Sequence, residues 1–417
     1  MKTDKQFDAI VIGAGPAGST AAALLAQNGR DVLVLEKERF PRYKIGESMI
    51  PYCYFPLQRL GLIDKMKQSH FTKKFSVQFI NTNGKVSAPF YFFQHFDHDA
   101  STTWQVVRSE FDLMLLDNAR EKGAEVIEAM KVKDLLRENG QVSGVKAQNS
   151  KGEMQQFKAK MTIDASGRDS LSIVRNGWRI DDPNLKKVSI WTYYKGAKRD
   201  PGLDEGATTI AYLPEKGWFW YIPLPDDLVG VGIVADKDYV YKETRDPEII
   251  FNNEIKKNAW IEDHLAAGKQ DCPFRITGDY SYRSKYCASD GLILTGDAFA
   301  FLDPVFSSGL LLALLSGELA ADAVDAALAK NDVSAHQFVD YGEKLCQGIE
   351  AMRKLVYAFY DKEFSFRTLF EKHPELRSDV TDGLIGNLFK DFDPLFAAVK
   401  EFAEIPDNLE HGRPLIV

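Results

Sequence analysis

The first candidate for chemistry in this sequence is a nucleotide site near the N-terminus. A short apolar run ends at Ile12 and is followed by Gly13, Gly15 and Gly18 in a G-x-G-x-x-G pattern. In this pattern the first glycine makes a tight turn, the second lets a pyrophosphate approach the backbone, and the third lets helix and strand pack closely. A second apolar strand ends at Glu36, whose carboxylate would accept hydrogen bonds from a ribose. The pattern predicts a dinucleotide and leaves FAD or NAD open.

A second segment with the same strand–turn–helix order spans residues 291–321. It contains an apolar strand, then Gly296 and Asp297, then a loop and a long apolar helix. In flavoproteins with this layout the aspartate holds the ribityl hydroxyls. The following helix begins under the isoalloxazine, where its positive end favours an electron-rich reduced flavin. Together with the first motif, this segment indicates FAD, whereas taken alone it could be an Asp-capped connection.

An aromatic stretch, W-F-W-Y-I-P, begins at Trp218. Alternate side chains of a strand share a face, so Trp218, Trp220 and Ile222 would point one way and the three residues between and after them the other. The stretch predicts a flat wall built from two indoles on one face of a sheet.

The elements that position these residues indicate an α/β protein with a Rossmann-like FAD-binding domain. Alternating, aromatic strands broken by turns predict a mixed sheet that is interleaved with this domain and roofs the pocket. The chain becomes helical from about residue 330. The predicted FAD-binding domain comprises residues 1–74, 106–179 and 276–328, the inserted sheet domain residues 75–105 and 180–275, and the C-terminal helical region residues 329–417.

Composition narrows the class of protein. The chain has 417 residues, and aromatic residues make up 12% of it, which favours a large apolar pocket. A net charge of −8 argues against nucleic acid or an anionic membrane as partner. The four cysteines match no C-x-x-C spacing, no histidine cluster suggests a metal, and neither a signal peptide nor a membrane-length apolar run is visible. We therefore expect a cytoplasmic protein without a metal.

Four motifs carry a resemblance to a known family. They are G-A-G-P-A-G (13–18), V-V-R-S-E-F-D-L-M-L-L (106–116), D-A-S-G-R-D-S (164–170) and T-G-D-A (295–298). Over about residues 5–325 the chain resembles the aromatic-hydroxylase type of FAD protein, which includes monooxygenases, geranylgeranyl-reductase-like enzymes and flavin-dependent halogenases. The resemblance implies that Arg108 contacts the flavin side of FAD and that Val132 and Ala165 lie by the adenine. The residues expected to bind FAD are Gly13, Gly15, Pro16, Ala17, Gly18, Glu36, Lys37, Arg42, Gly46, Glu47, Ser48, Arg108, Val132, Ala165, Gly296, Asp297, Pro304, Ser308 and Gly309.

Within that family, two features resemble the halogenases. The aromatic stretch fits W-x-W-x-I-P, a strand that in halogenases lies beside the flavin and screens the organic substrate from it. The expected flavin-screening wall is Trp218, Trp220, Ile222 and Pro223. The tripeptide Gly46-Glu47-Ser48 resembles the halogenase G-E-S turn on the cofactor side. Related reductases carry a similar aromatic strand, so the wall alone does not exclude them.

A lysine is the third halogenase feature. Halogenases place an essential lysine after the G-E-S turn and five residues before a phenylalanine, and here Lys74 precedes Phe79 by five. The neighbouring Lys73 leaves the assignment open by one position, and a loop lysine is ordinarily a solvated charge. In halogenases reduced flavin, oxygen and halide yield hypohalous acid, which the lysine delivers to the substrate. Desolvation suits lysine to this role because it lowers the pKa towards the reactive neutral form.

The segment D-P-V-F-S-S-G, residues 303–309, resembles the halogenase loop that holds the halide. The resemblance implies that backbone N–H groups at Ser308 and Gly309 bind the anion at a helix start. Tryptophan halogenases carry a glutamate where this chain has Phe306, as phenol and pyrrole halogenases do. We therefore expect an electron-rich phenol or pyrrole, free or bound to a carrier protein, and not free tryptophan.

Alternative functions remain open at this point. Gly230 and Gly232 lie inside a strand, and no second G-x-G-x-x-G precedes a helix. Either a separate reductase supplies reduced FAD, or a nicotinamide binds transiently. The alternatives to a two-component halogenase are a geranylgeranyl-reductase-like enzyme acting on a lipid double bond and an aromatic monooxygenase. By resemblance, four aromatic residues of the C-terminal region line the substrate pocket or serve as ordinary helix core: Tyr357, Phe359, Tyr360 and Phe364.

Overall fold

The first sheet of the protein carries the glycine motif at the carboxyl ends of its parallel strands. The computed structural model describes residues 5–278 and 281–416. Strands β20, β10, β1, β2 and β7 are parallel neighbours, β19 lies antiparallel at the edge, and the β8–β9 hairpin pairs with the start of β10. The bounds are β1 (Gln6–Ile12), β2 (Val32–Leu35), β7 (Glu125–Ile127), β8 (Met130–Glu138), β9 (Gln141–Asn149), β10 (Met154–Asp164), β19 (Ala288–Ser289) and β20 (Leu292–Leu294). The apolar runs of β1 and β2 are buried because parallel strands are covered on both faces.

Helix α1 follows the glycine motif and packs between two longer helices. It begins at Pro16, whose fixed φ suits the first helical position, and it contacts both α4 and α9. A Cβ at Gly317 of α9 would lie 2.4 Å from the carbonyl oxygen of Ala17, so only glycine lets the two helices approach this closely. The bounds are α1 (Pro16–Gln27), α2 (Tyr54–Leu60), α3 (Ile63–Gln68), α4 (Arg108–Glu121), α5 (Leu171–Asn176) and α9 (Gly309–Ala329).

The second sheet holds the tryptophan stretch as one of its central strands. Its order is β16-β12-β15-β14-β13-β4-β5, with β17 also pairing β12. The face of β14 that carries Phe219 and Tyr221 packs against the helices beside it, through Phe251 and Trp260. The bounds are β4 (Ser76–Ile80), β5 (Phe90–Tyr91), β12 (Lys187–Lys195), β13 (Thr208–Tyr212), β14 (Trp218–Pro223), β15 (Leu228–Asp236), β16 (Lys269–Gln270), β17 (Arg275–Gly278), α6 (Lys237–Val240), α7 (Pro247–Ile255) and α8 (Ala259–Leu265). The opposite face of β14, which carries the two tryptophans, points towards the first sheet.

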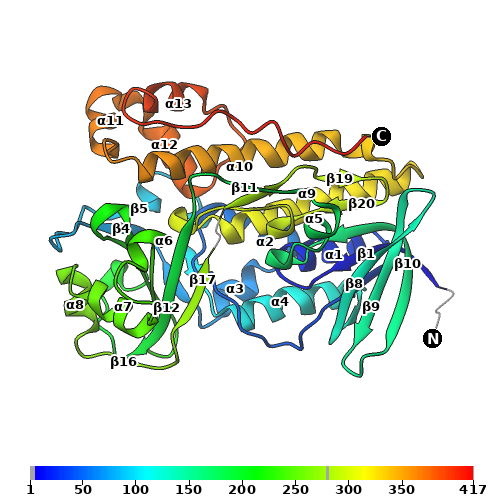
Figure 1. Ribbon diagram of the computed structural model, residues 1–417, viewed down its shortest axis with the longest axis horizontal. Coiled ribbons are helices and arrows are strands. Elements are labelled where there is room, and N and C mark those ends of the chain that lie inside the picture. The colour runs from blue at the N-terminus through cyan, green and yellow to red at the C-terminus, as the bar shows by residue number, and fades with distance from the viewer. Residues whose placement is uncertain (1–4, 279–280, 417) are drawn as a thin grey trace.

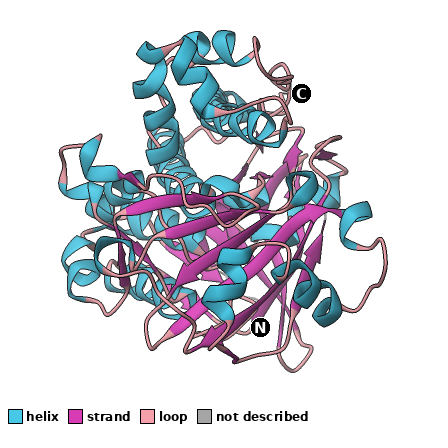
Figure 2. Cartoon of the chain, turned by 90° about the vertical axis from the view of Figure 1, so that its left-hand side faces the viewer, coloured by secondary structure: helices cyan, strands magenta, loops and turns pink. Residues whose placement is uncertain are grey.

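Two small sheets and a helical region complete the molecule. The C-terminal helices lie along one side of both sheets (Figure 1), and the view turned by 90° shows them stacked above the strands (Figure 2). Helix α10 packs on α9. The bounds are β3 (Thr72–Lys74) paired with β6 (Thr103–Gln105), β18 (Tyr282–Ser284) between β11 (Arg179–Asp181) and β21 (Ala300–Phe301), α10 (Val339–Tyr360), α11 (Phe366–Lys372), α12 (Arg377–Ile385) and α13 (Asp393–Val399).

The predicted domain boundaries stay a prediction. Strands from residues 75–105 do pair with strands from residues 180–275, since β4 lies beside β13 in the second sheet. Among the described residues, no helix combines the length and the apolar character that crossing a membrane would require.

Candidate active site

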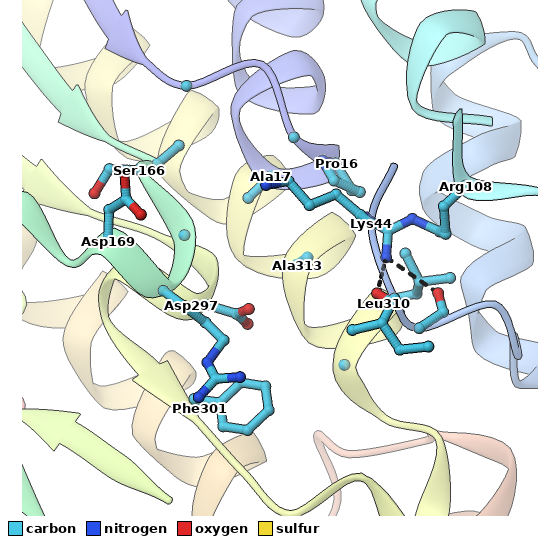
Figure 3. A pocket seen from close by; sticks show the side chains of 18 of the residues that line it. Pro16, Ala17, Lys44, Arg108, Ser166, Asp169, Asp297, Phe301, Leu310 and Ala313 are labelled. Carbon is cyan, nitrogen blue, oxygen red and sulfur yellow. Dashed lines mark hydrogen bonds between the residues drawn. The ribbon is translucent and has the colours of Figure 1, made fainter. Parts of the chain in front are cut away.

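A cavity of about 640 Å³ lies between the carboxyl edge of the first sheet and the tryptophan face of β14. Figure 3 shows Asp297 pointing into it, with Pro16 and Ala17 at the start of α1. Residues predicted from the sequence that line the cavity are Gly13, Gly15, Pro16, Ala17, Glu36, Lys37, Arg42, Gly46, Glu47, Ser48, Arg108, Val132, Ala165, Asp297, Pro304, Gly309, Trp218, Trp220 and Ile222. Those outside its lining are Gly18, Gly296, Ser308, Pro223 and Lys74. Pro223 lies outside because strand alternation turns it to the other face of β14.

The glycine motif forms a close turn at the strand ends. Gly13 has a φ of +96°, and a Cβ there would lie 2.5 Å from the carbonyl oxygen of Ala165 at the end of β10. A Cβ at Gly18 would lie 2.0 Å from the carbonyl oxygen of Gly13, so helix and strand touch at this point. At Gly15 the nearest atom to an added Cβ is a terminal nitrogen of Arg42, 3.8 Å away. Gly15 therefore leaves open space above the N-terminus of α1, where an anion would be stabilised.

Glu36 holds the glycine turn as well as facing the cavity. Its carboxylate accepts hydrogen bonds from the backbone N–H of Ala14 and of Glu38, both at 2.8 Å, and the side chain is buried. Each oxygen of a carboxylate has further lone pairs, so the same group can also accept from a ribose hydroxyl.

Replacing Glu36 with alanine is expected to weaken FAD binding by about ten- to a hundredfold. The change removes charge-assisted hydrogen bonds worth about 1.5–3 kcal/mol each and loosens the turn at Ala14. Quenching of FAD fluorescence on titration measures the dissociation constant. Glu125→Ala is the matched control, because Glu125 lies on the neighbouring strand β7 and makes only an exposed ion pair with Lys5. Unchanged affinity in Glu36→Ala would place the adenosine elsewhere.

A buried carboxylate binds two guanidinium groups that border the cavity. Asp112 accepts from both Nε and Nη2 of Arg108, at 2.8 and 3.0 Å, and from Arg42 at 2.8 Å. Arg108 also donates to the backbone oxygens of Ile45 and Gly46. Arg108 is thus a largely buried residue that anchors the loop before Ser48.

The tryptophan wall is larger than the sequence indicated. Trp218 and Trp220 are both buried, and Trp191 of β12 extends the wall beside Trp220 with a ring-centre separation of 6.3 Å. Gly232 of β15 leaves room for the indole of Trp220, since a Cβ at this position would lie 2.2 Å from Cζ2 of that ring. The sequence contained no local signal for Trp191, because only the pairing of β12 with β15 and β14 brings it to this face.

Tyr360 connects the wall to the loop at residues 303–309. Its hydroxyl accepts from the indole N–H of Trp218 and donates to the carboxylate of Asp303, both at 2.8 Å. Burial raises the pKa of Asp303 to about 6. None of the four C-terminal aromatic residues proposed as pocket lining borders either described cavity. Tyr360, at the end of α10, instead holds the wall and the loop in one arrangement.

Lys74 is fully buried at the end of β3. Its ammonium donates to Ser48 Oγ and to the backbone oxygen of Met49, each at 2.9 Å, and burial lowers its pKa to about 7. Ser48 borders the large cavity, so the amine lies one hydroxyl group away from it. Lys73, in contrast, is exposed to solvent. Of the two candidates, Lys74 is the one in a desolvated environment.

A second, small cavity lies next to the large one. It has a volume of about 20 Å³ and is bordered by apolar side chains, with Thr208 and Ser307 shared between it and the large cavity. Thr208 Oγ1 lies 2.8 Å from Ser48 Oγ. The apolar lining comprises Ile50, Val77, Phe79, Phe90, Val305, Phe306 and Leu384. Thr208 therefore borders both cavities and contacts Ser48, whose hydroxyl group accepts from the ammonium of Lys74.

Comparison with known proteins decides the family. The family model described as tryptophan halogenase matches residues 8–100 and 85–382. The chain belongs to the tryptophan halogenase family. The resemblance drawn from the four motifs is therefore confirmed, as are the α/β fold and the FAD-dependent class of enzyme. FAD is the cofactor of this halogenase.

Individual relatives match this halogenase over nearly the whole chain. A 1H-pyrrole-2-carbonyl-[peptidyl-carrier protein] chlorinase of Pseudomonas fluorescens is 32% identical, covering 93% of this halogenase and 90% of the relative. The corresponding brominase of Pseudoalteromonas luteoviolacea is 31% identical, covering 93% and 94%. The solved structure of a flavin-dependent brominase, Bmp2, has a TM-score of 0.86 at 29% identity, covering 95% of this chain and 98% of that one.

The residues of this halogenase fit FAD. An added Cβ at Gly309 would meet no atom within 4 Å, and at Gly15 the nearest atom would be 3.8 Å away, so the large cavity has room for a bound group beside both glycines. The acceptor Glu36 and the donors Arg42 and Arg108 all border this cavity. Asp297, with its pKa raised to about 6 by burial, borders the same cavity as an acceptor for hydroxyl groups.

Proposed function

We propose that this halogenase chlorinates or brominates a pyrrole ring held on a carrier protein, with Lys74 as the catalytic amine. The observation that carries the proposal is the position of Lys74, which is buried and donates to Ser48, a hydroxyl group that borders the FAD cavity and contacts Thr208 of the small apolar cavity. Two relatives named for carrier-bound pyrrole acids span more than nine tenths of the chain and support the substrate class.

Reduced FAD, when bound, supplies the electrons for the reaction of oxygen with halide that gives hypohalous acid. Lys74 then has to hold this acid beside the ring. A lysine with a pKa of about 7 is partly neutral at pH 7, so it can accept a hydrogen bond or react as an amine. In the transfer a carbon–halogen bond forms, the oxygen–halogen bond breaks, and the ring proton leaves with the oxygen as water.

The apolar cavity supports an electron-rich ring that needs little activation. Phe306 borders it at the place where a carboxylate would otherwise stand beside the lysine. A volume of about 20 Å³ is less than a pyrrole needs, so the ring enters by displacing side chains such as Phe79 and Phe90, which are only partly buried. A tether on a carrier protein would compensate for this displacement by raising the effective concentration of the ring.

Two partners complete the proposal. We propose that the halide binds at the start of α9, where Ser308 is the N-terminal cap and Gly309 borders the FAD cavity. A helix of this length presents free backbone N–H groups and a positive end to an anion. A separate flavin reductase supplies reduced FAD, because the sequence has no second nucleotide motif between a strand and a helix.

The test supplies the enzyme with reduced FAD, oxygen and either chloride or bromide. The substrates are pyrrole-2-carboxylate as a carrier-protein thioester, a simple phenol and free tryptophan, and mass spectrometry detects halogenated products. We expect product from the thioester, less or none from the phenol, and none from tryptophan. Tryptophan as the preferred substrate would refute the assigned substrate class. Rapid bleaching of the flavin by NADPH under anaerobic conditions, with no halogenated product from any substrate, would favour the reductase alternative.

A further inference from the structure

The loop that carries Glu47 connects the FAD cavity to the protein surface through a line of hydroxyl groups. Glu47 borders the cavity and is 3% exposed, and its Oε1 accepts a short hydrogen bond from the hydroxyl of Tyr193 on β12. The hydroxyl of Tyr193 lies 3.1 Å from that of Tyr43, whose side chain is 40% exposed. These contacts run from a buried carboxylate to a tyrosine at the protein surface, and each step between the three groups is within hydrogen-bond distance.

The hydrogen bonds in this line all point the same way. The indole N–H of Trp191 donates to Tyr43 Oη at 2.8 Å, and Tyr193 donates to Glu47. Because the Tyr193 hydrogen is used in this way, Tyr43 donates to Tyr193. Such an ordered row can pass a proton inward by successive transfers along its hydrogen bonds, with each hydroxyl rotating back afterwards.

At the inner end of this line of hydroxyl groups, one carboxylate oxygen of Glu47 lacks a hydrogen-bond partner among the described residues. This oxygen, Oε2, is buried, although the side chain borders the cavity. A buried carboxylate oxygen without a partner is unfavourable unless it carries a proton or meets a ligand. Burial also raises the pKa of Glu47, against the lowering effects of the Tyr193 hydrogen bond and of the charge of Arg108. Arg42 and Lys44, on the same loop, and Arg275, over the Tyr43 ring at 3.9 Å, are the other charged groups nearby.

The chemistry of the family needs protons inside this cavity. Per turnover, reduced flavin anion, O₂, halide anion and an aromatic C–H give oxidised flavin, the aryl halide and two molecules of water. Charge and hydrogen balance only if two protons enter from solvent. Exposed side chains such as Asp169 border the rim of the cavity, where water reaches it, whereas Glu47 borders the cavity at a buried position, to which a proton has to pass through the protein.

We propose that Glu47, Tyr193 and Tyr43 form a proton relay from solvent to the reduced-flavin side of the cavity. Glu47 Oε2–H delivers the proton, and Tyr193 and Tyr43 restore it from the surface. Glu47 is the catalytic residue of the relay, and the two tyrosines act through it. The relay requires the family's flavin chemistry but is independent of which aromatic substrate is used and of Lys74.

The experiment compares Tyr193→Phe, Tyr43→Phe, the double variant and Glu47→Gln in the complete halogenation reaction at several pH values. We expect each tyrosine variant to lower the turnover number about tenfold or more, and the double variant to lose no more than the worse single variant, because the groups act in series. Glu47→Gln is expected to lose about a hundredfold. FAD affinity should change less than twofold in the tyrosine variants.

A readout separate from activity uses the carboxyl C=O stretch of Glu47 in infrared difference spectra of the FAD-free protein, assigned by its loss in Glu47→Gln. Tyr193 donates to the charged form, so Tyr193→Phe is expected to raise the pKa of Glu47 further, whereas Tyr43→Phe moves it little. The falling limb of the turnover profile should move to higher pH in the same variant, since protonated Glu47 is the donor.

Tyr221→Phe is the control, because Tyr221 is a buried tyrosine on the opposite face of the same sheet, donating to the backbone oxygen of Lys198. We expect this variant to keep its turnover and pH profile. Additive losses in the double variant, or an unmoved pKa of Glu47 with unchanged turnover in Tyr193→Phe, would overturn the relay and leave the proposed substrate and Lys74 untouched.

Discussion

Replacing Lys74 with methionine is expected to abolish halogenation, with a loss of at least about a thousandfold, and to make the protein more stable. Methionine fills a similar volume but cannot hold or react with hypohalous acid. Oxidation of bound reduced FAD should continue at a normal rate, because the amine is separated from the large cavity by Ser48. Product formation by mass spectrometry and flavin oxidation by absorbance are measured on the same sample.

The stability gain follows from the lowered pKa of Lys74. Between about pH 7 and pH 10.5 the unfolded chain binds a proton that the folded protein does not, so this residue makes the free energy of unfolding rise with pH over that range. The destabilisation by Lys74 is therefore largest at and below pH 7. Lys74→Met removes this destabilisation, so the free energy of unfolding should rise by about a few kcal/mol at pH 7 and hardly at all at pH 10.5. The loss of the hydrogen bonds to Ser48 and Met49 reduces the gain. Denaturant unfolding at the two pH values measures it.

Lys73→Met is the matched control for this experiment. Lys73 is exposed on the same short strand, so we expect nearly wild-type activity and a stability change within about 0.5 kcal/mol at both pH values. If Lys74→Met retained halogenation, the amine would have no part in the transfer and the proposed mechanism would be wrong.

Replacing Gly232 with alanine is expected to open the tryptophan wall and uncouple the enzyme. The new methyl group would lie 2.2 Å from Cζ2 and 2.4 Å from Cη2 of Trp220, and 2.5 Å from Cβ of Trp191, so the indole of Trp220 has to move. We expect the yield of halogenated product per reduced FAD consumed to fall about tenfold, while a diffusible halogen trap in solution captures more oxidant. Overpacking should also lower stability by about 1–3 kcal/mol.

Gly278→Ala controls for the added methyl group itself. At Gly278, on strand β17, which pairs with β12 of the same sheet, an added Cβ would meet no atom closer than 3.9 Å. Coupling in this variant should equal that of the wild type. A Gly232→Ala enzyme with undiminished yield and unchanged tryptophan fluorescence would show that the wall tolerates the methyl group and that Gly232 is not required for its geometry.

The sequence by itself determined the features that depend on neighbours along the chain. The glycine spacing predicted the turn after β1, because the tight turn at Gly13 and the close approach at Gly18 involve residues a few positions apart. Strand alternation likewise placed Trp218, Trp220 and Ile222 on one face of β14, and all three line the cavity. Four short motifs were specific enough to predict an aromatic-hydroxylase type of FAD protein, and the aromatic strand, the G-E-S turn and the lysine then indicated a halogenase.

Only the tertiary structure decided which side chains complete the site. Lys73 and Lys74 are indistinguishable by local pattern, and it is the pairing of β3 with β6 and the packing over Met49 that bury one and expose the other. Tyr360 reaches Trp218 from 142 residues away, and Tyr193 reaches Glu47 from 146 residues away. Contacts of this kind depend on sheet register and on where α10 ends, which no local periodicity encodes, because side-chain burial is set by elements that the folded chain brings together.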